Sequence, residues 1–128
     1  MLINNIYNFY QMYSDSLLED DFSEYKNSTN VLDLWILIKI NRLIQEVESA
    51  MLGYNLNRAM RPITEFIDEF STWYLRRSRD RLKGDDNLDK NRALSTMRFV
   101  FLNLSKVMAP FMPFISEDLW QKISGYNF

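Results

Sequence analysis

Apolar side chains recur at steps of three and four along most of this 128-residue chain, which is the period of an amphipathic α-helix. The pattern predicts five helical segments, of which the first runs from about Ile3 to Tyr13. Residues 15–30 follow and are acidic and polar, with no sustained period. We therefore expect a loop there, with room for one turn of helix around Leu17 and Leu18.

The second predicted helix has clear signals at both ends. Asn30 can act as its N-cap, and the Asp33 carboxylate lies three residues on, where it can reach back to the cap. Gly53 ends the segment. Its first turns, Leu34 to Ile38, are apolar all round, which predicts burial on several sides.

The third predicted helix starts near Asn55, a plausible cap, and ends at Gly84. Pro62 lies past its first turn, so we expect a lost backbone hydrogen bond and a kink. The predicted inner face consists of Ala59, Ile63, Phe66, Ile67, Phe70, Trp73 and Tyr74.

The last two predicted helices are separated by the sequence Ala109-Pro110. The fourth takes Asp86 as its cap, and the fifth opens with Pro113 at its first position. The fourth has the most regular stripe in the chain, consisting of Leu94, Met97, Phe101, Leu104 and Met108, with Val100 and Val107 beside it. With no strand-like alternation of useful length, residues 1–128 are predicted to form a single all-α helical bundle.

Composition removes several classes of function. The chain has no Cys and no His, so it lacks thiolate metal ligands and the commonest general base, and we expect no catalytic residues and no metal site. No apolar run approaches the ~20 residues of a membrane span, and no signal peptide pattern is present. These features lead us to expect a cytoplasmic protein with no membrane partner.

The net charge of −2 hides a local surplus of positive charge. Residues 53–84 contain seven bases against four acids. The bases are Arg58, Arg61, Arg76, Arg77, Arg79, Arg81 and Lys83. When the inner stripe of the third helix is continued by its own period, Arg77 and Arg81 take the next inward positions, flanked by Arg76, Arg79 and Lys83.

Charge alone does not decide between two interpretations of this basic helix end. The arginines could pair with carboxylates of neighbouring helices and with the negative end of the helix dipole. Alternatively, they could bind phosphates, because the planar guanidinium group can donate two parallel hydrogen bonds to phosphate oxygens.

Three stretches carry a recognisable pattern: NVLDLWILIKINRLI (Asn30 to Ile44), YNLNRAMRPITEFIDEFSTWYLRRSRDRL (Tyr54 to Leu82) and MAPFMPFISEDLWQKI (Met108 to Ile123). In order and correctly spaced, they resemble the helical anticodon-binding domain of class I aminoacyl-tRNA synthetases. Within that family, the run WYLRRSR is similar to the isoleucyl branch.

The resemblance implies a fragment of a larger enzyme that binds the anticodon arm of an isoleucine tRNA, but not DNA. The parent's other domains would use ATP to attach the amino acid, while this chain alone would need no cofactor and would not be an enzyme. Alternatives are the same domain from a valyl or leucyl relative, or a protein-interaction scaffold with no nucleic-acid role.

For RNA contact, we expect the phosphate backbone to meet Arg76, Arg77, Arg79, Arg81 and Lys83, with Arg58 and Arg61 as further candidates. Trp35, Trp73 and Tyr74 are assigned to the core.

Overall fold

A computed structural model of the chain describes residues 2–13, 24–53, 56–84 and 86–124. Within these ranges every regular element is helical, which confirms the all-α prediction. The elements are α1 (Leu2–Tyr13), the 3-10 helix η3 (Glu24–Asn27), α2 (Val31–Leu52), α3 (Leu56–Glu69), the π-helix η4 (Phe70–Leu75), α4 (Arg76–Lys83), α5 (Asn87–Met108) and α6 (Pro113–Ser124).

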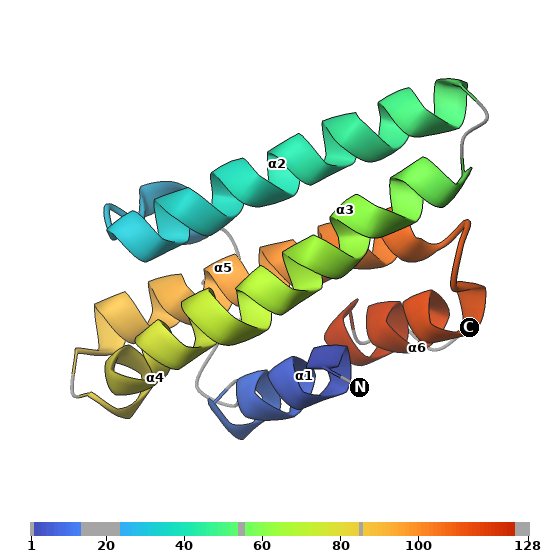
Figure 1. The fold of residues 1–128 in the computed structure, drawn as a ribbon. Coiled ribbons are helices and arrows are strands. Elements are labelled where there is room, and N and C mark those ends of the chain that lie inside the picture. The colour runs from blue at the N-terminus through green and yellow to red at the C-terminus, as the bar shows by residue number, and fades with distance from the viewer. Residues whose placement is uncertain (1, 14–23, 54–55, 85, 125–128) are drawn as a thin grey trace.

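The helix α5 lies at the centre of the bundle. It packs against α2, α4 and α6, and α3 runs beside α2 along the front in Figure 1. The helices α1 and α6 lie on the side of the bundle away from α2 (Figure 1). The central position of α5 explains why its predicted stripe is the most regular one, since all five side chains of that stripe are fully buried.

The segments α3, η4 and α4 form one continuous helix. Glu69, Leu75 and Arg76, which stand at the two junctions, all keep right-handed helical backbone angles. The helix also continues through Pro62. Counting this long helix once, the five predicted helices are confirmed, and Gly84 follows its last residue as expected.

Both described N-caps agree with the sequence analysis, but the predicted role of Asp33 is wrong. The Asn30 side chain accepts a hydrogen bond from the backbone N–H of Leu32 at 2.9 Å, and the Asp86 carboxylate accepts one from the N–H of Asp89 at 3.2 Å. The Asp33 carboxylate does not close a capping box, because it is buried and bound elsewhere. The proposed cap Asn55 lies outside the described residues.

Two further expectations need correction. Leu34 and Ile38 in the first turns of α2 are exposed, so this helix start is covered on fewer sides than its composition predicted. The loop expected over residues 15–30 is described only from residue 24, where η3 forms instead. Tyr25 anchors η3 to α5, because its ring stacks on Phe99 with centroids 4.3 Å apart.

An aromatic cluster joins α1, the long helix and α5. The Phe101 ring lies 5.5 Å from that of Phe70 and 5.7 Å from that of Tyr10, in tilted and edge-to-face arrangements. These contacts fix η4 against α5, and they thereby set which side chains of η4 and α4 face outward.

Candidate nucleic-acid interface

The π-helix η4 changes which side of the long helix faces the core. A π-type turn holds one extra residue, and one residue corresponds to about 100° of rotation around an α-helix. The predicted inward positions Trp73 and Arg77 therefore turn outward, and Ser78 and Leu82 are buried after η4. This register shift is the central difference between the predicted and the observed helix.

The three aromatic residues assigned to the core have different outcomes. Tyr74 is fully buried, as predicted. Trp35 is only half-buried, and Trp73 is 50% exposed, so the prediction for Trp73 is wrong. The cause is the extra residue of η4, which carries the Trp73 indole to the surface between α2 and α4.

The guanidinium group of Arg81 is bound by two carboxylates. Its side chain is only 10% exposed. Its Nη1 and Nη2 atoms each donate to Asp33 at 2.9 Å, while Nε and Nη2 donate to Asp89 at 2.9 and 2.7 Å. For Arg81 the structure therefore supports the ion-pair interpretation, and we remove this residue from the phosphate-binding set.

Asp33 is the hub of this buried network, a role that was not predicted from the sequence. The fully buried Asp33 carboxylate also accepts hydrogen bonds from the Tyr74 hydroxyl at 2.6 Å and the Ser28 hydroxyl at 2.5 Å. It thus ties the start of α2 to η4 and α4. The one available signal was a lone acid in an otherwise apolar helix start, because a buried charge needs partners of this kind.

The network shifts the pKa of each of three groups. Hydrogen bonds from Arg81 lower the pKa of the Asp89 carboxyl below its ordinary value. Burial, together with the Asp33 charge, raises the pKa of the Tyr74 hydroxyl well above its ordinary value. Burial opposes the charged form of Arg81, but hydrogen bonds to Asp33 and Asp89 outweigh it and raise the pKa of the guanidinium. Arg81 and Asp89 are therefore both ionised at neutral pH.

The lowered pKa of Asp89 predicts a pH-dependent stability. A depressed carboxyl pKa stabilises the fold above the unfolded value near 3.8, and this stabilisation is lost as the pH falls through the folded value. We expect Asp89→Asn to unfold more easily than wild type at pH 7, and the two free energies of unfolding to converge as the pH falls through the folded pKa of Asp89. Urea titrations from pH 7 to pH 2 measure this, with the exposed Asp68→Asn as control. A constant gap between Asp89→Asn and wild type would contradict it.

The other cations of α4 point to solvent. Arg76, Arg77, Arg79 and Lys83 are exposed, and none of them pairs with a carboxylate among the residues that the structure describes. Two of them rest on aromatic rings. The guanidinium of Arg77 lies 4.7 Å from the ring centroid of Trp73, and that of Arg79 lies 5.8 Å from that of Phe9.

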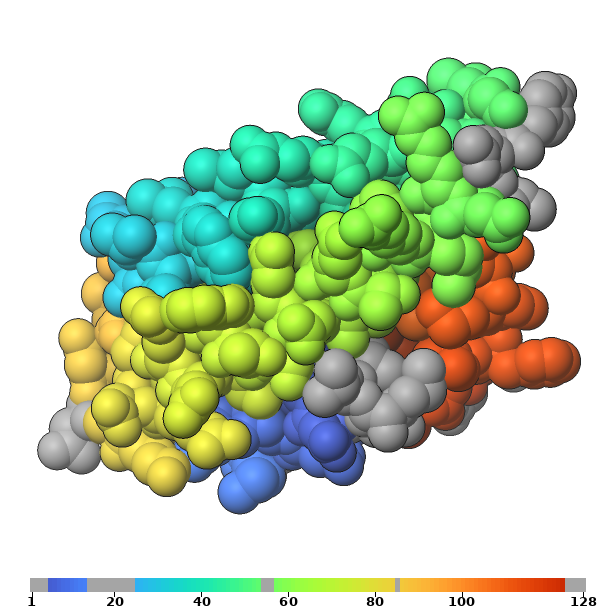
Figure 2. All heavy atoms as spheres, in the orientation of Figure 1, coloured from blue at the N-terminus to red at the C-terminus, as the bar shows by residue number. Residues whose placement is uncertain are grey.

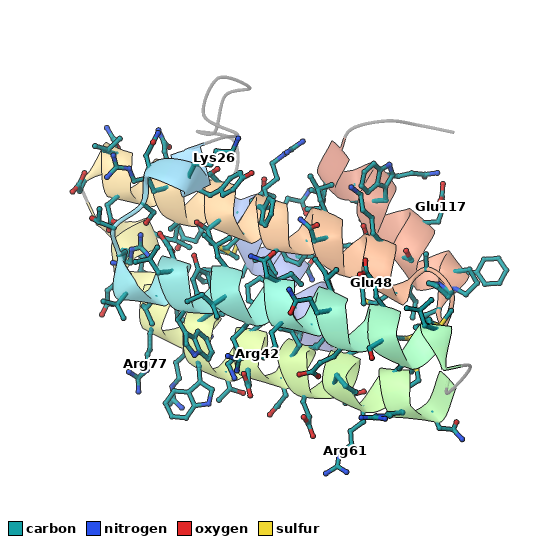
Figure 3. All side chains as sticks on the ribbon, turned by 90° about the horizontal axis from the view of Figure 1, so that it is seen from above. Lys26, Arg42, Glu48, Arg61, Arg77 and Glu117 are labelled. Atoms are coloured by element: carbon teal, nitrogen blue, oxygen red, sulfur yellow. The ribbon has the colours of Figure 1, made fainter. Side chains whose placement is uncertain are left out.

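Arg58 and Arg61 lie in the first half of α3, away from this group. Both are exposed, and Arg61 pairs with Glu65 at 3.1 Å on the same helix. Figure 3 shows Arg61 and Arg77 projecting from the side of the bundle formed by α3 and α4, whereas Lys26 and Glu117 lie on the opposite side. Arg61 and Arg77 thus project from the same side of the molecule, whereas Arg79 lies against Phe9 of α1.

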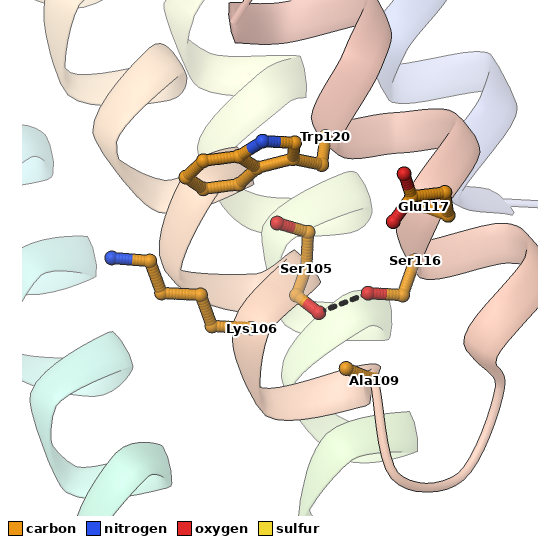
Figure 4. Close-up of a pocket in the computed structure, with 6 residues that line it drawn as sticks. All are labelled: Ser105, Lys106, Ala109, Ser116, Glu117 and Trp120. Carbon is orange, nitrogen blue, oxygen red and sulfur yellow. Dashed lines mark hydrogen bonds between the residues drawn. The ribbon is translucent and has the colours of Figure 1, made fainter. Parts of the chain in front are cut away.

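A separate hollow of about 440 Å³ lies between α5 and α6 (Figure 4). The Ser116 hydroxyl donates a hydrogen bond to the Ser105 carbonyl at its wall, and the Lys106 ammonium lies 5.5 Å from the Trp120 ring centroid. With one lysine and Glu117 beside it, the hollow has no surplus of positive charge comparable to that of α4.

Within the described parts of the chain, no three or more acidic side chains gather closely enough to hold a metal ion. None of the described helices combines the length and the apolar character needed to cross a membrane.

Comparison with known proteins points to one family. The family described as "Anticodon-binding domain of tRNA ligase" matches residues 33–127. The isoleucine–tRNA ligases of Clostridium tetani and Clostridium novyi are each 40% identical to this chain over 124 residues, or 93% of it. The isoleucine–tRNA ligase of Chlamydia caviae is 35% identical over 124 residues. The chain spans about 12% of the length of each of these curated relatives.

Proposed function

The chain belongs to the family of anticodon-binding domains of tRNA ligases, and from this premise we propose that it binds the anticodon arm of an isoleucine tRNA. The observation that carries the proposal is the outward group on α4, namely Arg76, Arg77, Arg79 and Lys83, which we call the α4 cations. Their charges are not neutralised by described carboxylates, so they remain able to bind phosphate.

The phosphate backbone and the loop bases of the RNA would be bound by different kinds of interaction. Guanidinium groups bind phosphate oxygens through paired N–H donors, which holds the RNA without choosing its sequence. The bases of a single-stranded loop can be splayed out and read by stacking and by hydrogen bonds to their edges. The buried pair of Arg81 and Asp33 supports this surface from beneath, since it fixes α4 against α2.

The parent protein is proposed to be an isoleucine–tRNA ligase. In that protein the bundle would hold the tRNA while other domains, outside this chain, attach isoleucine with the use of ATP. We place the parent in the cytoplasm, and we assign no catalytic step to this chain.

The scaffold alternative has less support. It requires the basic helix end to be fully neutralised within the protein, and among the described residues Arg81 alone of the five cations of α4 is bound in an ion pair. Partners from residues 15–23 lie outside the described ranges. Figure 2 shows the face of the bundle on which α2 and the long helix run side by side, where an RNA would lie.

The proposal is tested by titrating the 128-residue chain with a fluorescein-labelled anticodon stem-loop of isoleucine tRNA at several salt concentrations. We expect binding whose logarithm of affinity falls linearly with the logarithm of salt concentration, with a slope of about −0.7 to −0.9 for each phosphate contacted. An acceptor-stem hairpin of equal length serves as control and should bind more weakly. Equal affinity for both hairpins, or an affinity independent of salt, would refute the proposal.

A further inference from the structure

A second hollow, of about 360 Å³, opens beside the α4 cations. Its walls include Leu32, Trp35 and Lys39 of α2, Glu69 at the end of α3, Trp73 of η4 and Arg77 of α4. We call it the Trp35–Trp73 hollow. Its volume falls near the lower end of the range of roughly 300–1,000 Å³ that is usual for small-molecule sites. It therefore has room for a flat ring system.

The exposure of Trp73 needs an explanation, because the rest of the long helix buries its large aromatic side chains. Phe66, Phe70 and Tyr74 are each less than 5% exposed, but Trp73 is 50% exposed. The π-helix η4 places it there, and π-type turns are frequent at functional sites. The indole thus presents one large aromatic surface to whatever fills the hollow.

The charges around the hollow favour an anionic occupant. Lys39 and Arg77 face one carboxylate, Glu69, which already pairs with Lys39 at 3.3 Å. The Lys39 ammonium lies 5.8 Å from the Trp35 ring centroid, and the Arg77 guanidinium lies 4.7 Å from that of Trp73. Each indole therefore has a cation beside it, and one positive charge is left over.

A nucleotide combines the two features that these walls match. Its base offers a flat π-surface for stacking on an indole, and its phosphate offers the negative charge that Arg77 can bind. An apolar peptide side chain would use the indoles but would leave the surplus cation unmatched. Arg77 also belongs to the α4 cations, so a chain of phosphates along α4 leads directly to the mouth of the hollow.

We propose that the Trp35–Trp73 hollow takes one unpaired base of the bound RNA, stacked on the indole of Trp73 with its phosphate at Arg77. The inference rests on the proposed function and deepens it, because it names the place where a loop base leaves the RNA stack. The hollow between α5 and α6 does not compete for this role, since its Lys106 and Trp120 are not continuous with the α4 cations.

The test compares Trp73→Ala with wild type on a set of anticodon stem-loops that each lack one loop base. Stacking on an aromatic side chain contributes about 1–3 kcal/mol per base, which corresponds to roughly 5- to 150-fold in affinity. For wild type, we expect one abasic position to weaken binding by about that factor. For Trp73→Ala, the intact loop should already be weakened by a similar factor, and the same abasic position should have no further effect.

Two controls separate stacking from other causes. The salt slope of Trp73→Ala should equal that of wild type, because no phosphate contact is removed. Phe114→Ala removes a 90% exposed aromatic ring on α6, outside the hollow, and should bind every RNA as wild type does.

If Trp73→Ala binds all the RNAs as wild type does, the inference is overturned, and the hollow would then suit a protein segment of the parent instead. If the unaltered chain binds no stem-loop, the proposed function is refuted, and this inference, which depends on it, is refuted as well. Circular dichroism confirms that both variants remain folded.

Discussion

Replacing Asp33 with alanine is expected to lower the free energy of unfolding by about 3–5 kcal/mol, because it leaves a buried cation without one of its two partners. The Arg81 side chain is 10% exposed, so water cannot replace the two hydrogen bonds that it donates to Asp33. The hydroxyl groups of Tyr74 and Ser28 lose their acceptor as well. Urea unfolding at pH 7, followed by circular dichroism, measures the change.

Asp68→Ala is the matched control, because it makes the same chemical change at an exposed position of α3. It should alter the free energy of unfolding by no more than about 0.5 kcal/mol. A double-mutant cycle with Arg81→Ala should give a coupling energy of about 0.5–3 kcal/mol, as expected for side chains in one network. A loss below about 1 kcal/mol for Asp33→Ala would contradict the role assigned to this network.

Replacing Arg76, Arg77 and Arg79 together with alanine is expected to weaken stem-loop binding by about 100-fold at 0.1 M salt. Removing three phosphate contacts should make the salt slope shallower by roughly 2–3. If the two affinities are equal at 1 M salt, a slope difference of about 2 corresponds to a roughly 100-fold difference in affinity at 0.1 M salt. All three side chains are exposed, so the free energy of unfolding should change little. Fluorescence anisotropy over a salt series provides both quantities.

The matched control removes three exposed lysines from other faces, Lys26 on η3, Lys106 on α5 and Lys122 on α6. It changes the net charge by the same amount but leaves α4 intact. We expect a salt slope close to that of wild type. Equal losses in the two triple variants would mean that only net charge matters, and the assignment of the phosphate-binding surface to α4 would then be wrong.

The helices could be predicted from the sequence because their signals are local. The stripe of α5 and the caps Asn30 and Asp86 depend on residues a few positions apart, and each behaves as predicted. The π-helix could not be predicted in the same way, because the sequence of η4 has no Gly or Pro to mark it. Its extra residue is stabilised by distant partners, including the contact of Phe70 with Phe101.

The candidate site was predicted only in part for the same reason. A run of bases along a helix indicates a cationic surface, but it does not reveal which member turns inward once the register shifts. Arg81 and Arg77 lie one helical turn apart, yet the first is bound to Asp33 and Asp89 and the second stacks on Trp73. That difference depends on Asp33, which is 48 positions away from Arg81 in the chain.

The most direct test of the phosphate-binding surface follows the arginine Nε–H resonances of ¹⁵N-labelled chain while the anticodon stem-loop is added. The signals of Arg76, Arg77 and Arg79 should shift in a salt-dependent manner, because their exposed guanidinium groups meet the phosphates. The signal of Arg81 should stay in place, because its Nε already donates to Asp89 at 2.9 Å. Unmoved signals for the three exposed arginines, with RNA bound, would contradict the account.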